Sequence, residues 1–353
     1  MPDPKTALVA GATGATSKQL LETLTADPDW TVIGLSRNPP AASGGKVKFI
    51  AADLSNAASC RDALKGETGI THIFYTARAK HGEIAVESVE DNTAMLGNVL
   101  DAVEPAAKGL RHVNFVQGGK YYGQHLGPFP TPAREDDPRH MPPNFYFAQQ
   151  DLLVERQKGK NWTWSAARPD FVCDFSPGRG RNIVSIVGTF AAICKELGLP
   201  FCFPGAWGCY DTLKQATDAT QLARAMVHVA THPAGANKAF NVTNGDVFRW
   251  KYAWPKIAAF YGLQVAEPRT LKLAEWMADK EPVWERIVKK HGLKSQKLSD
   301  VAIWGYADSQ LSQDYDVISS TTRLRQAGFH EIVDTEDMFV AHLTRYRDAK
   351  ILP

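Results

Sequence analysis

The sequence predicts an α/β protein, in which a doubly wound parallel sheet is followed by a smaller, mostly helical region. Three observations predict this fold. Short apolar runs alternate with helical stretches through the first half, a glycine-rich turn follows the first run, and the chain beyond residue 245 is helix-like and aromatic. Strands that alternate with helices are typical of a parallel sheet, because each parallel crossover needs a covering helix.

The expected strands are apolar runs that end at small or turn-forming residues. They cover residues 6–10, 30–35, 47–51, 70–76, 112–117, 164–168 and 239–242. Apolar side chains at helical spacing predict helices over residues 18–24, 83–103 and 183–197. Right-handed crossovers bring the carboxyl ends of these strands to one edge of the sheet, where we expect the ligand.

Composition excludes several classes of function. The chain has 353 residues, 44% of them hydrophobic, which is enough for a full core. Its 40 basic and 38 acidic side chains give no electrostatic reason to expect a nucleic acid or a membrane surface as partner. The five cysteines include no CxxC pair, which favours reduced thiols over disulfides or a zinc site. With no signal segment or long apolar run, we expect a cytoplasmic protein without a metal.

The segment GATGATS, residues 11–17, lies between the first strand and the first helix. Gly11 permits a tight turn, and Gly14 lets main-chain N–H groups approach a pyrophosphate at the helix N-terminus. The third small position is Ser17. This context favours a Rossmann-type dinucleotide site over a glycine turn in a cofactor-free sheet. The expected cofactor contacts in the turn are Gly11, Thr13, Gly14, Ala15 and Thr16.

The end of the second strand selects the cofactor. An NAD site would carry an acidic residue there for the ribose hydroxyls. This chain has Ser36, Arg37 and Asn38 instead, and an arginine can pair with the additional 2′-phosphate of NADP. The other interpretation of Arg37 is a solvated surface residue. We expect NADP(H), bound in part by these three residues.

Other cofactor contacts are expected where later strands end. Asp53 and Leu54 follow the third strand, where an acidic side chain can meet the adenine amino group, although Asp53 fits a helix cap or turn equally well. Thr76 and Ala77 follow the fourth strand, near the expected nicotinamide ribose. Gln117 ends the fifth strand at the same edge.

The catalytic groups do not form the familiar YxxxK pair. Tyr252 and Lys256 match it but enclose a proline, and Tyr346 and Lys350 lie close to the C-terminus; both pairs are far from the strands that should hold the nicotinamide. We therefore reject both pairs.

A split pair fits better. Lys120 follows the fifth strand in GGKYYG, and Tyr146 lies in NFYFAQQD just before a helix, so both should reach the carboxyl edge of the sheet. From position alone, Tyr146 could equally be a buried structural tyrosine and Lys120 a surface lysine.

Several segments in order resemble one family. They are GATGATS, GGKYYG, NFYFAQQD, RPDFVCDFSPGRGRN, GTFAAICKELG, AFNVTNGDVFRWK, EPVWERIV and IWGYAD. In these the chain resembles the progesterone 5-beta-reductase and iridoid synthase family, an atypical branch of the short-chain dehydrogenases. The resemblance implies NADPH-dependent reduction of the carbon–carbon double bond of an enone or enal, with Lys120 and Tyr146 as the catalytic residues.

The chain departs from the family pattern around the expected pocket. Gly118 stands for a threonine and Tyr121 for a histidine, and Phe147 replaces the second tyrosine of an NFYY-like segment. Gly305 replaces a tryptophan, and Tyr306 lies where plant members carry a phenylalanine. We expect a pocket unlike that of the steroid-reducing plant enzymes. The substrate contacts that we expect are Phe147, Phe171 and Tyr306.

The expected reaction is hydride transfer to the β-carbon of the substrate, with Tyr146 donating a hydrogen bond to the enolate oxygen and Lys120 keeping the local potential positive. Reduction of a carbonyl group by the same pair is the nearest alternative. A non-catalytic NADP sensor is an alternative of another class.

We expect residues 1–180 to form the NADP-binding domain, with strands returning near residues 200–245, and residues 181–353 to form the substrate-binding region. The sequence does not decide whether two copies of the chain form a homodimer.

Overall fold

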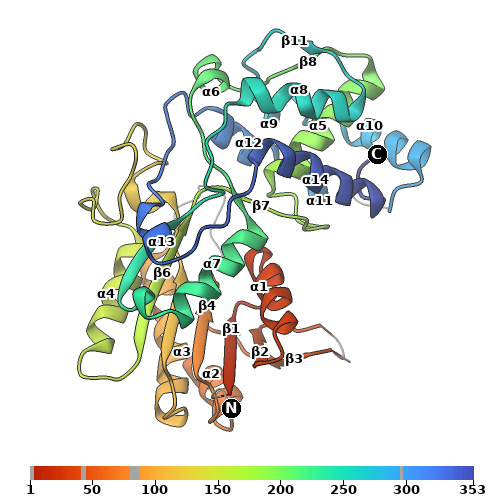
Figure 1. Cartoon of the computed structure of the whole chain (residues 1–353). Coiled ribbons are helices and arrows are strands. Elements are labelled where there is room, and N and C mark those ends of the chain that lie inside the picture. Colours follow the sequence, from red (N-terminus) through yellow and green to blue (C-terminus); the bar gives the residue numbers. More distant parts are fainter. Residues whose placement is uncertain (1–3, 41–44, 80–86, 295–296) are drawn as a thin grey trace.

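A seven-stranded parallel sheet forms the centre of the computed structural model, which describes residues 4–40, 45–79, 87–294 and 297–353 (Figure 1). The strand order is β10-β6-β5-β4-β1-β2-β3. The strands are β1 (Lys5–Ala10), β2 (Trp30–Ser36), β3 (Val47–Ala51), β4 (His72–Tyr75), β5 (His112–Val116), β6 (Thr163–Pro169) and β10 (Lys238–Val242). Because the order reverses between β1 and β4, the carboxyl ends of these two strands mark the switch point where ligands bind.

Helices cover both faces of the sheet. They are α1 (Ala15–Ala26) and α7 (Ala219–Thr231) on one face, and α2 (Ala57–Leu64), α3 (Val89–Ala106) and α4 (Phe145–Gln157) on the other. Val9 and Phe74 of the sheet pack with Met226 of α7, and Val113 packs with Leu100 of α3. These two apolar layers confirm the predicted doubly wound α/β fold.

The C-terminal region packs mainly around α5 (Ile183–Leu197), which is buried along most of its length, and it lies above the sheet in Figure 1. Trp250, Trp254 and Trp284 are fully buried in its core. Its other helices are α6 (Trp207–Asp211), α8 (Trp250–Tyr261), α9 (Leu273–Trp276), α10 (Glu281–His291), α11 (Leu298–Val301), α12 (Trp304–Leu311), α13 (Thr322–Gln326) and α14 (Thr335–Asp348). Of these, α13 contacts β10 of the sheet.

Short elements connect the two parts. They are the strands β7 (Val172–Cys173), β8 (Phe201–Cys202), β9 (Thr217–Asp218) and β11 (Val265–Ala266), and the 3-10 turns η1 (Gly119–Tyr122) and η2 (Pro233–Gly235). β7 pairs with β9, and β8 pairs with β11. The division of the chain at residue 180 stays a prediction.

Two details differ from the sequence expectation. The helix expected from residue 83 begins at Val89, because the Ser88 hydroxyl caps it by accepting from the N–H of Asp91; residues 80–86 lie outside the described part of the chain. Helices α2 and α7 were not predicted.

Among the described residues, no helix has the length and apolar character that crossing a bilayer requires, and no cluster of metal ligands occurs.

Candidate functional site

The turn between β1 and α1 requires glycine at Gly11. Its φ is +90°, and a Cβ atom there would lie 2.8 Å from the main-chain nitrogen and Cα of Ala77. Ser17 is buried; its hydroxyl donates to the carbonyl oxygen of Gly11 at 2.7 Å and bonds the Thr76 hydroxyl at 2.7 Å. The serine at the third position of the motif therefore ties the turn to the end of β4.

The first turn of α1 has no side-chain cap. Gly14 is the N-cap residue and offers no acceptor, so the first main-chain N–H groups stay available. Thr13 is exposed and its carbonyl oxygen accepts from Arg179, while Thr16 is half-buried. The side chain of Ala15 lies outside the described part. The free amides and the positive end of the helix suit a diphosphate.

The end of β2 carries no carboxylate. Ser36 is buried, and its hydroxyl makes no hydrogen bond within the described part of the chain. Arg37 and Asn38 are exposed beside it. An unpaired buried hydroxyl next to an exposed guanidinium is a fitting partner for a phosphorylated ribose.

Asp53 forms a local turn. Its carboxylate accepts from the N–H of Ser55 at 3.1 Å and from the Ser55 hydroxyl at 2.8 Å, and these bonds, with a smaller contribution from Arg37, hold its pKa below the ordinary value. The cap of α2 is Asn56. Leu54 is buried. A contact of Asp53 or Leu54 with adenine stays a prediction.

Gln117 belongs to a buried network beneath the site. Its amide donates to the carbonyl oxygen of Tyr146 at 3.0 Å, and its oxygen accepts from Arg168 at 2.7 Å. Arg168 is 2% exposed and also donates to Tyr122 at 2.9 Å. The side chain of Gln117 thus supports the first turn of α4, and its contact with the cofactor stays a prediction.

Lys120 and Tyr146 come from separate elements that one asparagine joins. Lys120 lies in η1, directly after β5, and Tyr146 lies in the first turn of α4. Asn144 accepts from the main-chain N–H of Tyr146 at 2.9 Å and donates to the carbonyl oxygen of Lys120 at 2.8 Å. The same side chain caps α4 and holds η1 against it.

The Tyr146 phenol is largely buried, and its hydroxyl lies beside the main chain after β5. A Cβ atom on Gly118 would lie 3.4 Å from this oxygen. Within the described residues the hydroxyl makes no hydrogen bond, so its proton is free to be donated. Burial raises the pKa of Tyr146, while the charges of Arg78 and Arg181 act in the opposite direction. The phenol therefore stays protonated and can serve as a hydrogen-bond donor.

The charges of two arginines, Arg78 and Arg181, act on this phenol, and the sequence pointed to neither of them. The Lys120 ammonium lies 3.3 Å from the Glu87 carboxylate, which also pairs with Arg78. Burial, followed by the charges of Arg78 and Arg181, lowers the pKa of Lys120 to about 8. The spacing of these residues in the chain gave no signal for Arg78, Glu87 or Arg181, because Arg78 and Glu87 lie between β4 and α3 whereas Arg181 lies between β7 and α5.

The three expected substrate contacts differ in exposure. Phe147 is buried, with its ring 4.9 Å from that of Tyr121 and packed edge to face. Phe171 is half-buried and stacks against Trp250 at 6.4 Å. Tyr306 is half-buried, and the guanidinium of Arg181 lies over its ring, 4.8 Å from the ring centre. Phe171 and Tyr306 keep accessible surface; their contact with a substrate, like that of Phe147, stays a prediction.

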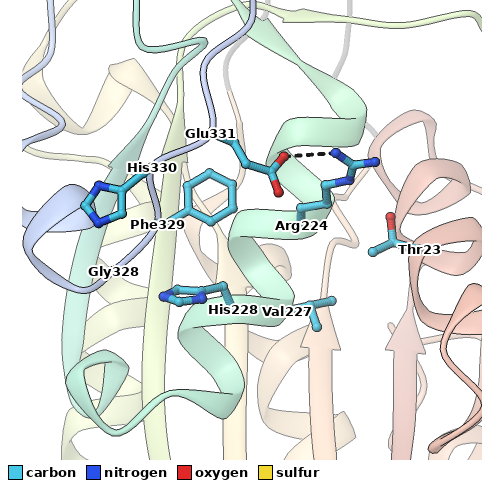
Figure 2. A pocket seen from close by; sticks show the side chains of 8 residues that line it. All are labelled: Thr23, Arg224, Val227, His228, Gly328, Phe329, His330 and Glu331. Atoms are coloured by element: carbon cyan, nitrogen blue, oxygen red, sulfur yellow. Dashed lines mark hydrogen bonds and ion pairs between the residues drawn. The ribbon is translucent and has the colours of Figure 1, made fainter.

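A separate hollow of about 330 Å³ lies beside α7 (Figure 2). Arg224 and Glu331 lie on its wall and pair with each other at 2.9 Å. The imidazole Nε2 of His228 is hydrogen-bonded to the carbonyl oxygen of Ala327. Because these polar groups are already partnered, the hollow offers a ligand little to bind, and none of its residues belongs to the constellation around Tyr146.

The strand order and the glycine turn define a Rossmann-type dinucleotide-binding enzyme. The chain matches the model of the PRISE-like Rossmann-fold domain over residues 54–353, and it belongs to that family. It is 35% identical to the 3-oxo-Delta(4,5)-steroid 5-beta-reductase of Arabidopsis thaliana over 98% of this chain and 93% of that protein. It is also 35% identical to the (S)-8-oxocitronellyl enol synthase CYC2 of Camptotheca acuminata, with the same coverage of both chains. These relationships make the chain an oxidoreductase and confirm the predicted family.

Solved structures share the fold at lower identity. WbmG of Bordetella bronchiseptica, in complex with NAD, superposes with a TM-score of 0.67 at 15% identity, over 99% of this chain and 96% of that chain. RMD of Pseudomonas aeruginosa, in complex with NADPH, gives 0.65 at 16% identity over 98% of both chains. One fold therefore accommodates NAD in one protein and NADPH in the other, so the choice of cofactor has to be argued from the end of β2.

Proposed function

We propose that this enzyme uses NADPH to reduce the carbon–carbon double bond of an α,β-unsaturated carbonyl compound. The observation that carries the proposal is the Tyr146 hydroxyl, which lies beside Gly118 at the carboxyl edge of the sheet with no partner among the described residues. The names of the two relatives, a steroid 5-beta-reductase and an enol synthase, support the same chemistry.

The residues at the switch point fit NADPH. The close contact of Gly11 with Ala77 leaves no room for a side chain, and Gly14 leaves the amides at the start of α1 uncapped. Arg37 supplies a positive charge where the 2′-phosphate would lie, and no carboxylate among residues 36–38 opposes it. When bound, this cofactor supplies the hydride.

The remaining chemistry concerns the carbonyl oxygen of the substrate. As the β-carbon gains hydride, negative charge develops on that oxygen, and the Tyr146 hydroxyl donates a hydrogen bond to it. Lys120 and Arg78 keep the surrounding potential positive, and Glu87 holds these two cations in place. A proton from solvent then adds to the α-carbon and completes the reduction.

A product analysis tests this proposal. The purified chain is incubated with an enal and with either NADPH or NADH. We expect faster oxidation of NADPH and a saturated aldehyde as the product. An allylic alcohol would instead show carbonyl reduction, and no oxidation of either cofactor across a panel of enals and enones would contradict an enzymatic role.

A further inference from the structure

Arg181 is a cation held in a fixed place by its neighbours. It lies between β7 and α5, and its two flanking residues are both anchored. The carbonyl oxygen of Gly180 accepts from the N–H of Ile303 at 2.8 Å, and a Cβ on Gly180 would lie 2.3 Å from the carbonyl oxygen of Ser299. Asn182 is 2% exposed and caps α5. The main chain that carries Arg181 is therefore fixed by close contacts.

The guanidinium of Arg181 has no anionic partner in the part of the chain that the structure describes. It is exposed and stacks on the Tyr306 ring at 4.8 Å. Two buried carboxylates lie near Tyr306, and neither forms an ion pair with Arg181. Asp170 accepts from Gln124 at 3.1 Å, and Asp174 accepts from Asn182. Within the described residues, the guanidinium N–H groups of Arg181 therefore stay available to a ligand.

Two more cations interact electrostatically with Arg181: Arg78, which follows β4, and Lys120 in η1. Asn92 accepts from the N–H of Ala79 at 2.9 Å and donates to the carbonyl oxygen of Ser88 at 2.7 Å. These bonds hold the main chain next to Arg78 and next to Glu87. Glu87 is the single described carboxylate that pairs with Arg78, and it also pairs with Lys120. Two cations thus share one carboxylate, and adding Arg181 leaves the site with an excess of positive charge.

The charge of Arg181 affects the protonation of Tyr146 and Lys120. Burial is the largest cause of the pKa shifts of Tyr146 and Lys120, and the charges of Arg78 and Arg181 come next. With a neutral substrate, only solvent would balance this excess charge. A carboxylate would compensate it, because guanidinium binds carboxylate through two parallel hydrogen bonds.

We infer that the substrate carries an anionic group, a carboxylate in the simplest case, which binds to Arg181 while its enone carbonyl lies at Tyr146. This inference rests on the proposed function and adds a substrate class to it. The other anion that could pair with Arg181 is the diphosphate of the cofactor. That group already has the uncapped start of α1 and the nearby Arg179, which donates to the carbonyl oxygen of Thr13.

The experiment compares two ligands that differ in one charge. A cyclohexenone with a carboxymethyl group and its methyl ester are assayed as substrates. Their saturated products are titrated calorimetrically into the full chain loaded with NADP⁺, a measurement that needs no turnover. We expect the acid to be favoured ~10-fold or more in both kcat/KM and Kd. Arg181→Met should abolish this preference and leave Kd for NADPH unchanged, and Arg181→Lys should retain part of it.

Arg179→Met is the matched control, because it removes a neighbouring guanidinium that contacts the glycine turn. It should leave the acid-to-ester ratio as in the wild type. Equal affinity for acid and ester in the wild type, or a preference that survives Arg181→Met, would overturn the inference. The inference would also be overturned if Arg181→Met weakened NADPH binding by the same factor as it weakened binding of the acid, because Arg181 would then serve the cofactor. If the acid binds preferentially but neither enone is reduced, the reaction is wrong and the anion site stands.

Discussion

The side-chain amide of Asn144 donates a hydrogen bond to the carbonyl oxygen of Lys120 at 2.8 Å. The oxygen of the same amide accepts from the N–H of Tyr146 at 2.9 Å. Two residues that are distant in sequence are thereby held by one side chain, and the function proposed here depends on this connection.

Asn144→Ala should lower both stability and turnover. Loss of the cap on α4 should cost about 1 kcal/mol of unfolding free energy, and loss of the link to Lys120 should lower kcat while the Kd for NADPH stays the same. Asp334→Ala is the control, because Asp334 caps α14 in the same way, far from the site. Urea unfolding and steady-state kinetics measure both effects. Equal kcat for the two variants would show that Asn144 is only a cap.

The rate should depend on the protonation of Lys120. Its pKa is lowered to about 8, so the ammonium is present below that pH and is lost as the pH rises through it. If the reaction needs this positive charge, kcat/KM falls above about pH 8. Lys120→Arg should remove that alkaline decline, because a guanidinium stays charged there. A decline that is unchanged in Lys120→Arg would assign it to another group.

Arg37→Ala should weaken the binding of NADPH selectively. A charge-assisted hydrogen bond to the 2′-phosphate is worth about 1.5–3 kcal/mol, so Kd for NADPH should rise ~10-fold or more and Kd for NADH should change little. Lys48→Ala controls for surface charge, because Lys48 lies on β3 and pairs with Glu67. Fluorescence titration with both nucleotides gives the values. A parallel loss for NADH would contradict the role of Arg37 in selectivity.

Gly11→Ala should destabilise the fold and impair nucleotide binding. The new Cβ would lie 2.8 Å from main-chain atoms of Ala77 at a φ of +90°, and such strain costs about 1–3 kcal/mol. Gly66→Ala is the matched control, since nothing lies within 4 Å of its Cβ position. Thermal melting and NADPH titration test the pair, and equal behaviour of the two variants would contradict the assigned tightness of the turn.

The sequence was informative wherever the signal is local. Apolar runs and the turn that begins at Gly11 specify strands and a helix start within a few residues, and the sheet follows from them. Lys120 and Tyr146 could be selected because Lys120 follows a strand and Tyr146 lies at the start of a helix at the ligand edge. Asp53 shows the limit of this reasoning, since its turn with Ser55 was one of two interpretations that the sequence left open.

Arg78 and Arg181 could not be found in this way. Each lies in a loop without periodicity, and the relation of Arg181 to Tyr146 arises only when the chain after β7 packs above the sheet. The packing of Gly180 against Ser299 and Ile303, which fixes the place of Arg181, is a long-range contact without a motif. Such charges are visible only after folding has brought the loops together.

The most direct test of the central claim is the turnover of Tyr146→Phe with an enone and NADPH. This variant removes only the hydroxyl that is proposed to bind the developing enolate. We expect kcat to fall by about 10²–10³, with NADPH binding and melting temperature close to those of the wild type. Near-wild-type kcat in Tyr146→Phe would contradict the account.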